Sequence, residues 1–394
     1  MTSSGDAAGE RLIRGYGGRL FLAVSLGWLL LQGGRLVLSP LLPTVRVELG
    51  LSNAEAGFAF TMLWGLYALL QYPSGRLSDR LSRKTLLVAG LGLAAVGFAA
   101  LGLAGSYTWF LLGAAVVGFG VGLYPTSARA LLSDLYVERR GQAFGLHTAA
   151  GDFGGLLAAG LGTVVLAVAT WRWAYLPVVI AVAALALALH VWSREPYEVR
   201  RVDLAIADTG RRLLAARQLR GLLVAYVLFA FTWQATAAFL PTFLLVEKGF
   251  SPAIANAGFA AFFLVGATVK PIAGGVSDRV PRSRFVTSLL AVAAAVMAGV
   301  LVADAAWLVA VGVVVFAAGL MAVPPVLQAY LMDTFASDSM GGDLGGMRSV
   351  YIGLGSLGPT VIGYVADLAS LTAGFAVLVG CLVVGAVLVT VAAR

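Results

Sequence analysis

The chain has 394 residues, of which 60% are hydrophobic and only 12% are charged, and its formal net charge is +8. Soluble globular domains carry about 25% charged residues, so this composition excludes an ordinary soluble fold. We expect the excess positive charge to lie along a lipid bilayer, and it does not call for a nucleic-acid partner. The single cysteine excludes an internal disulfide and a cysteine-based metal site, and we expect neither a metal nor a cofactor.

Twelve apolar segments follow one another along the chain, each close to the ~20 residues that one helical membrane crossing needs. They are too long and too uniformly apolar to be barrel strands, which run about ten residues and alternate in character. We therefore expect an all-α membrane protein with twelve transmembrane helices. The segments span roughly residues 19–44, 54–75, 85–105, 108–132, 143–169, 173–193, 220–246, 252–276, 284–304, 306–331, 344–367 and 371–391.

The basic residues are distributed unevenly about these segments. On one side the loops hold only Arg46, Arg172 and Lys248, whereas the loops and termini on the other side hold most of the 27 Lys and Arg residues. Cytoplasmic loops of membrane proteins carry an excess of Lys and Arg. We therefore expect a multi-pass plasma-membrane protein with both termini in the cytoplasm.

A charged motif after the second segment recurs 199 residues later, close to half of the chain length. Residues 75–84 (GRLSDRLSRK) are matched at that offset by residues 274–283 (GGVSDRVPRS). Residues 124–134 match residues 323–333 in the same way. The repeat predicts two related halves of parallel topology.

The repeat and the apolar segments together predict three parts. We expect an N-terminal six-helix bundle over residues 1–193 and a C-terminal six-helix bundle over residues 220–394. Residues 194–219 form the longest polar stretch between them, and we expect a cytoplasmic linker there. This linker either contains a short amphipathic helix on the membrane surface or is simply flexible.

Three motifs together resemble the major facilitator superfamily of secondary transporters. They are residues 75–84 after the second segment, Arg140-Gly141 before the fifth, and residues 171–175 (WRWAY) before the sixth. The resemblance covers essentially the whole chain. It implies two pseudo-symmetric six-helix bundles that open a central cavity alternately to either side of the membrane.

The resemblance also implies a gate at the two charged hinges, because the family's equivalent of Asp79 contacts a helix end in the opposite half. An anion is favoured at a helix N-terminus, which makes such a contact stabilising but breakable. The alternative is that these charges only enforce topology. Arg129 and Arg348 lie near the same end, where we expect them to snorkel or to act in the gate rather than contact solute. The expected gating residues are Gly75, Asp79, Arg80, Arg83, Arg129, Asp134, Asp278, Arg279 and Arg348.

Other charges fall deep inside apolar segments, where a charge at the bilayer centre costs about 2.5–3.5 kcal/mol. Arg35 lies deepest, about 24 Å along the helix from Arg19, so we expect it to bind solute, with a structural pairing as the alternative. Lys270 lies about 12 Å inside the second hinge and either binds solute or snorkels. The remaining polar and aromatic residues expected to line this cavity are Trp64, Tyr67, Gln71, Tyr124, Trp233, Gln234 and Tyr330. For the aromatic face of Trp64 and Tyr67, packing between helices is the alternative.

Two titratable groups lie in the fifth segment. Asp152 is far from both ends of its segment, and His147 precedes it by five residues. Either side chain could carry a proton through a transport cycle. Alternatively, Asp152 pairs with a buried cation and stays ionised.

Arg35 and Lys270 give the expected cavity more positive than negative charge. The sequence therefore favours an alternating-access transporter that moves a small organic anion, by proton symport or by anion exchange. We expect it to act as a monomer in the lipid bilayer, with a small-molecule solute and, for symport, protons as its partners.

Two other functions stay open. The first is a proton-coupled efflux antiporter for drugs or lipophilic cations. The family's antiporters often carry an acid in the first segment and a Gly-Pro ending of the fifth, whereas here Arg35 occupies the first segment and the fifth has no proline. The second is a channel or non-transporting sensor on the same fold. We do not expect an enzyme, because the sequence shows no metal-binding cluster, nucleophile with base, or phosphate-binding loop.

Overall fold

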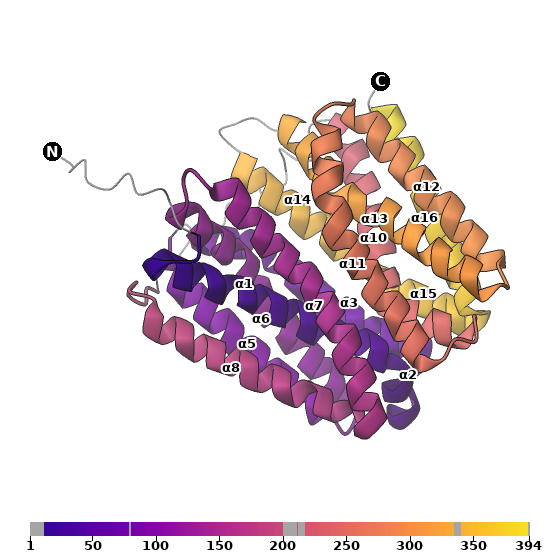
Figure 1. Cartoon of the computed structure of the whole chain (residues 1–394), viewed down its shortest axis with the longest axis horizontal. Helices are drawn as coiled ribbons and strands as arrows, with labels where there is room; N and C mark the ends of the chain where they lie inside the picture. The colour runs from indigo at the N-terminus through magenta and orange to yellow at the C-terminus, as the bar shows by residue number, and fades with distance from the viewer. Residues whose placement is uncertain (1–11, 79, 200–210, 212–216, 335–339, 393–394) are drawn as a thin grey trace.

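The computed structural model describes residues 12–78, 80–199, 211, 217–334 and 340–392. Its helices, labelled in Figure 1, are α1 (Gly15–Leu36), α2 (Leu38–Leu49), α3 (Asn53–Leu69), α4 (Gln71–Ser78), α5 (Arg83–Gly102), α6 (Tyr107–Leu135), α7 (Arg140–Val168), η1 (Trp171–Ala174), α8 (Tyr175–Trp192), α10 (Arg217–Val246), α11 (Pro252–Ser277), α12 (Arg282–Val302), α13 (Ala306–Thr334), α14 (Met340–Gly355), α15 (Leu357–Leu368) and α16 (Leu371–Ala392).

The all-α prediction is confirmed, since the described residues form helices, turns and loops with no strand among them. Eleven helices in this described part of the chain are long and apolar enough to cross a membrane. The remaining predicted segment is the second, which is divided at Leu70 into the 17-residue α3 and the eight-residue α4. Each piece is shorter than the ~20 residues of a full crossing, so the two must cross together.

Three of the predicted segments are interrupted within their length, and a proline explains each break. α1, α3 and α14 end at Leu36, Leu69 and Gly355. A proline follows each of these residues four positions later, at 40, 73 and 359. Proline has no backbone N–H and its ring clashes with the carbonyl four residues before it, which ends or kinks a helix there.

Serine side chains define where several helices begin. The hydroxyl of Ser52 accepts a hydrogen bond from the Glu55 backbone N–H, and the Glu55 side chain accepts one from the Ser52 backbone in return. This reciprocal arrangement satisfies two donors that the first helical turn leaves free. The same capping role is played by Ser82 at α5, Ser106 at α6 and Ser251 at α11.

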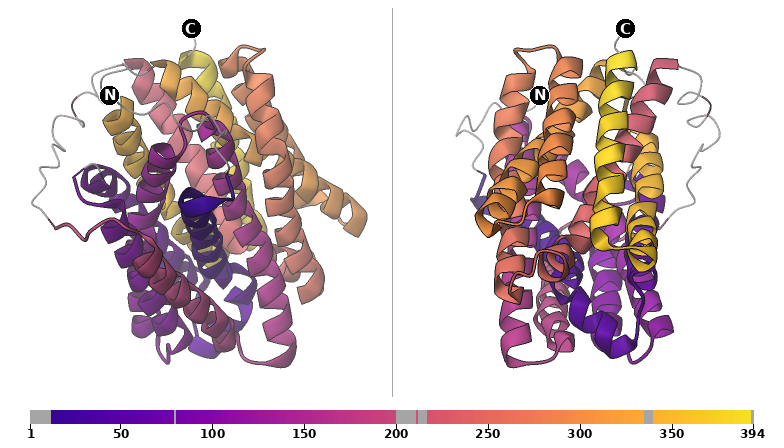
Figure 2. Two further views of the ribbon diagram at one scale, coloured as in Figure 1. Left: turned by 60° about the vertical axis from the view of Figure 1, so that its left-hand side comes forward. Right: turned by 90° about the vertical axis from the view of Figure 1, so that its right-hand side faces the viewer.

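The helices pack in two groups that follow chain order. In the first group, α1 lies along α7, and α5 lies along α6 and α8. In the second group, α13 lies along α11 and α12, and α16 lies along α10 and α12. Figure 1 shows the first group in indigo to magenta and the second in orange to yellow. In Figure 2 the helices of both groups run in broadly the same direction, as in a bundle that crosses a membrane.

The two groups touch where α3 crosses α15 and where α7 crosses α11. A Cβ added at Gly57 would lie 2.2 Å from the Pro359 carbonyl oxygen, and one at Gly363 would lie 2.2 Å from that of Asn53. Glycine is therefore required for the backbones of α3 and α15 to come this close. At the other crossing, a Cβ at Gly155 would lie 2.2 Å from the Phe263 ring.

The contact between α3 and α15 lies at the end of the bundle opposite the first charged hinge. There, the Asp367 carboxylate accepts hydrogen bonds from the Asn53 backbone N–H at 2.9 Å, the Asn53 side-chain amide at 2.8 Å and the Ala54 backbone N–H at 2.8 Å. A carboxylate at a helix N-terminus satisfies free donors and interacts favourably with the helix dipole. Asp367 thus holds the start of α3 against the end of α15.

Candidate functional site

Arg35 lies in the last turn of α1, next to the break before Pro40, and is 3% exposed. Its Cζ atom lies 3.8 Å from the centroid of the Trp64 ring, 4.7 Å from that of Tyr67 and 5.6 Å from that of Trp28. Three aromatic faces therefore stabilise the guanidinium by cation–π contact.

The guanidinium of Arg35 keeps unused hydrogen-bond donors. None of the ion pairs among the described residues involves Arg35. Its Nε and Nη1 atoms are buried and donate to no protein atom. A buried charge of this kind is costly unless it is paired, so the arrangement suits an incoming anion or carbonyl group.

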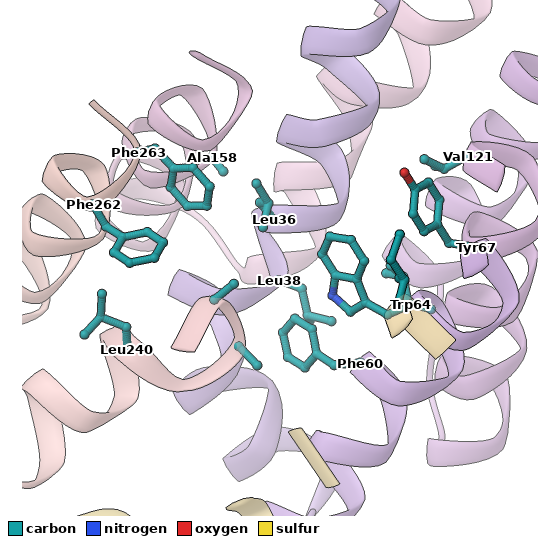
Figure 3. Close-up of a cluster of buried hydrophobic side chains, with 14 of the residues drawn as sticks. Leu36, Leu38, Phe60, Trp64, Tyr67, Val121, Ala158, Leu240, Phe262 and Phe263 are labelled. Carbon is teal, nitrogen blue, oxygen red and sulfur yellow. The ribbon is translucent and has the colours of Figure 1, made fainter. Parts of the chain in front are cut away.

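An aromatic contact joins the two helix groups beside Arg35. In Figure 3, Trp64 and Tyr67 project from one helix, and Phe262 and Phe263 lie across from them on α11. The Trp64 ring meets the Trp233 ring of α10 edge to face, with 5.3 Å between centroids. Trp233 also donates from Nε1 to the Met321 sulfur at 3.3 Å. Trp64, Tyr67 and Trp233, all predicted to line one site, are thus brought together.

A cavity of about 430 Å³ lies at the hinge end of the bundle, between α4, α6, α13 and α14. Gln71 and Gly75, both predicted site residues, line it. The Gln71 amide donates to the Tyr67 carbonyl at 3.4 Å, which connects this cavity to the aromatic cluster. The polar side chains on the cavity wall are Gln71, Tyr72, Arg76, Ser78, Thr126, Arg129, Gln328 and Arg348.

Three guanidinium groups lie near Tyr67. The Cζ of Arg35 lies 4.7 Å from the Tyr67 ring centroid, and Arg129 and Arg348 line the same cavity as Gln71, which follows Tyr67 by four residues. The charges of all three act on the Tyr67 hydroxyl. Arg129 donates from Nε to the Pro125 carbonyl at 3.1 Å, and the Nε of Arg348 has no partner. From sequence, Arg129 and Arg348 are expected to snorkel or to gate; on the wall of the cavity both can also contact a solute.

Asp152 of α7 and Lys270 of α11 form an ion pair, with 2.5 Å between Oδ1 and Nζ. The structure thus shows the pairing that was one of the two alternatives for Asp152. His147 stacks on Trp28, with 6.1 Å between ring centroids, and its Nδ1 has no partner. His147 is therefore placed one aromatic ring away from Arg35.

The other predicted cavity residues lie further from the open space. The Tyr124 hydroxyl donates to the Val24 carbonyl at 2.9 Å, inside the contact between α6 and α1. The Gln234 amide donates to the Ile352 carbonyl at 3.1 Å, and its Oε1 is buried without a partner. Tyr330 is half-buried on α13.

Part of the predicted gate network is present at the first hinge. Arg83 pairs with Asp134 at 3.2 Å and donates to the Ser78 hydroxyl at 3.0 Å, which joins α4, α5 and α6. Asp79 lies outside the described residues, and Arg80 is exposed.

At the second hinge, Asp278 pairs with Arg282 at 3.2 Å, whereas Arg279 is exposed. These contacts stay within one helix group each.

Gln328 belongs to the sequence repeat but is not among the predicted site residues. Gln328 occupies the position that matches Arg129 at the 199-residue offset, and both line the cavity. The signal was therefore present in the repeat, because matched positions of two related halves face the same central space.

A bundle of membrane-crossing helices around a polar cavity between two helix groups is the architecture of a solute transporter. The chain belongs to the Major Facilitator Superfamily, whose family model matches residues 24–355 and 222–394.

Two curated relatives have named solutes. The chain is similar to a probable sulfoacetate transporter, SauU, of Cupriavidus necator: it is 26% identical over 264 residues, which cover 62% of this chain and 61% of that protein. It is also 23% identical over 256 residues to a probable L-galactonate transporter of Escherichia coli, which covers 60% of this chain and 56% of that protein. The chain thus spans less than two thirds of the length of either relative.

The fold is also that of a solved transporter. A crystal structure of a bacterial homologue of the human lysosomal transporter Spinster, in an inward-facing and occupied conformation, matches with a TM-score of 0.83. The match covers 97% of both chains at 19% sequence identity.

Proposed function

We propose that the chain is an alternating-access secondary transporter of a small organic anion, with Arg35 as a principal contact of the solute. The observation that carries the proposal is the buried guanidinium of Arg35, which has two unused donors and no carboxylate partner among the described residues. An anion would supply the charge-assisted hydrogen bonds that this group lacks. The named solutes of the two relatives, sulfoacetate and L-galactonate, are anions and support the same class.

The proposed cycle uses two related lobes, residues 1–193 and 220–394, which rock about the cavity between them. The contact of α3 with α15 at one end and the cavity at the hinge end support a conformation that is open on the hinge side. The excess of Lys and Arg at the hinges and termini supports a cytoplasmic position for that side. The conformation would then be open to the cytoplasm, in a monomer of the plasma membrane.

The proposed coupling is proton symport or exchange for a second anion. Protonation of Asp152 would remove its charge and free Lys270, which would weaken a link between α7 and α11. The cavity is less suited to binding a cation for efflux, because none of the described side chains that line it is a carboxylate.

A thermal-shift panel tests the proposal on the purified full chain. Small carboxylates and sulfonates are compared with lipophilic cations and neutral sugars, in wild type and in Arg35→Gln. We expect organic anions to raise the unfolding temperature of wild type only. Arg284→Gln, which removes an exposed cation at the start of α12, serves as the matched control and should respond like wild type. Stabilisation by cations and not by anions would overturn the proposal in favour of efflux.

A further inference from the structure

We infer that the solute carries two negatively charged groups joined by a short spacer, as a dicarboxylate or a sulfocarboxylate does. The inference rests on the proposed function and narrows its substrate class. It comes from the positive charges that the described residues place at the cavity and beside it, which exceed what one anionic group can neutralise.

The charge balance gives the first argument. Lys270 and Asp152 neutralise each other. Arg35, Arg129 and Arg348 take part in no ion pair among the described residues, yet all three interact with one hydroxyl, that of Tyr67. None of the described side chains that line the cavity is a carboxylate, so within this described part of the chain a monoanion would leave two of these three charges without a counter-charge. Unpaired charges shielded from water are costly.

Repulsion between two of the arginines gives the second argument. Arg129 reaches the cavity from α6 and Arg348 from α14, and their like charges repel each other. α6 and α14 belong to different helix groups, so repulsion between these two arginines favours separation of the two helix groups. An anion bound between the two side chains would offset that repulsion. Such an anion binds the closed arrangement better than the open one, which is what moves a conformational equilibrium.

The free donors lie in two places, which gives the third argument. Arg35 lies over the rings of Trp64 and Tyr67 with Nε and Nη1 unused. Arg348 lies on the wall of the open cavity, with Nε unused. In the inferred arrangement one anionic group contacts Arg348 and Arg129 on the cavity wall, and the second contacts Arg35 beside the Tyr67 ring.

A covalent spacer between the two groups matters energetically. Two separate monoanions would have to be ordered independently, whereas binding the first group of a dianion brings the second to its subsite at high effective concentration. Each charge-assisted pair formed in a site of low dielectric is stronger than a neutral hydrogen bond. We therefore expect a dianion to bind at least about tenfold more tightly than a monoanion of the same shape.

The test uses isothermal titration of the full chain in detergent at neutral pH. Succinate, which carries two charges there, is compared with succinamate, in which one carboxylate is replaced by an uncharged amide of the same shape. Malonate and glutarate vary the spacer. The variants are Arg348→Gln, Arg129→Gln and Arg35→Gln, with Arg284→Gln as the control for loss of an exposed cation.

We expect one dianion of the series to bind wild type at least about tenfold more tightly than its monoanionic isostere, with one ligand per chain. In Arg348→Gln or Arg129→Gln this preference should disappear, because the dianion then loses one of its two charged contacts. Affinity for the monoanion, whose single charge can still use Arg35, should fall by a smaller factor than affinity for the dianion. Loss of a cooperative unfolding transition would show that a variant is misfolded. Two variants are used so that, if one misfolds, the other still tests the inference.

Equal affinity for dianion and monoanion, or binding of two monoanions per chain, would overturn this inference. An equal loss of affinity for dianion and monoanion in Arg348→Gln and Arg129→Gln would also overturn it. If monoanions still bind and their binding depends on Arg35, the proposed function stands and only the inference of a dianionic solute is wrong. Failure of every anion in the series to bind, in wild type as in Arg35→Gln, would count against the proposed function itself.

Discussion

Lys270 of α11 forms an ion pair with Asp152 of α7 at 2.5 Å, and this pair links the two helix groups well inside the bundle. Asp152 is 8% exposed, and the Lys270 side chain is 22% exposed. Ion pairs this deeply placed are more sensitive to loss of one partner than to loss of both, because a single loss leaves an uncompensated charge.

A double-mutant cycle should reveal this coupling. We expect Asp152→Asn and Lys270→Gln each to lower the unfolding temperature, and the double variant to recover part of the loss, with a coupling energy of about 1–3 kcal/mol. The control is the i, i+4 pair Asp278 and Arg282, in which the Asp278 side chain is 70% exposed and the corresponding changes should couple by less than about 0.5 kcal/mol. Strictly additive losses at Asp152 and Lys270 would show that the pair has no energetic role.

The same carboxylate tests the coupling mechanism. If Asp152 carries the proton of a symport cycle, Asp152→Asn should abolish accumulation driven by a pH gradient while solute exchange at equal concentrations continues. The two modes are measured side by side in proteoliposomes, because exchange needs no net proton movement. Undiminished gradient-driven accumulation in this variant would exclude Asp152 as the proton carrier.

Asp367 should hold α3 and α15 together at the end of the bundle opposite the hinges. Its carboxylate accepts three hydrogen bonds from the start of α3, so Asp367→Asn should weaken this contact by about 1 kcal/mol, given the exposure of the carboxylate. Thr61, whose hydroxyl lies 2.6 Å from that of Thr360, reports on the same contact. We expect faster labelling of Thr61→Cys by an impermeant thiol reagent, in a Cys381→Ser background.

Asp304, exposed in the loop between α12 and α13, provides the matched carboxylate control. Asp304→Asn should leave the labelling rate unchanged. This role of Asp367 is refuted by equal labelling rates in the Asp367→Asn and parent proteins.

Gly363 should be required for closure between α3 and α15. A Cβ there would lie 2.2 Å from the Asn53 carbonyl oxygen, so Gly363→Ala should hold the start of α3 and the end of α15 apart and strongly reduce turnover. Gly380 of α16 has no atom within 4 Å of the corresponding Cβ, and Gly380→Ala should transport normally. Solute exchange in proteoliposomes measures both variants, and wild-type turnover in Gly363→Ala would show that the crossing can widen without cost.

Much of the architecture could be predicted from the sequence because each crossing is a long apolar run. The helix breaks at Val37, Leu70 and Ser356 were not predicted, although each lies three residues before a proline. Proline does not break every helix of this chain, because Pro125 and Pro271 lie inside continuous helices. The presence of a proline therefore could not have shown which predicted segments are broken and which are continuous.

The candidate site was predictable in part. Arg35 stood out by depth, and the i, i+3, i+7 spacing placed Trp64, Tyr67 and Gln71 on one helical face. The approach of Arg348 to Tyr67 could not be foreseen, because it depends on how α14 sits against α3 and α4. Such contacts between distant segments are set by tertiary packing, and local sequence carries no record of them.

The most direct measurement is anion exchange by Arg35 variants in proteoliposomes, with an anion that stabilises wild type in the thermal-shift panel. We expect Arg35→Gln to reduce exchange by at least about 100-fold, because a charge-assisted contact is lost in a site shielded from water. Arg35→Lys should exchange anions at an intermediate rate, because lysine keeps the positive charge but lacks the planar guanidinium group. Arg284→Gln should match wild type. Wild-type exchange in a folded Arg35→Gln protein would contradict the account.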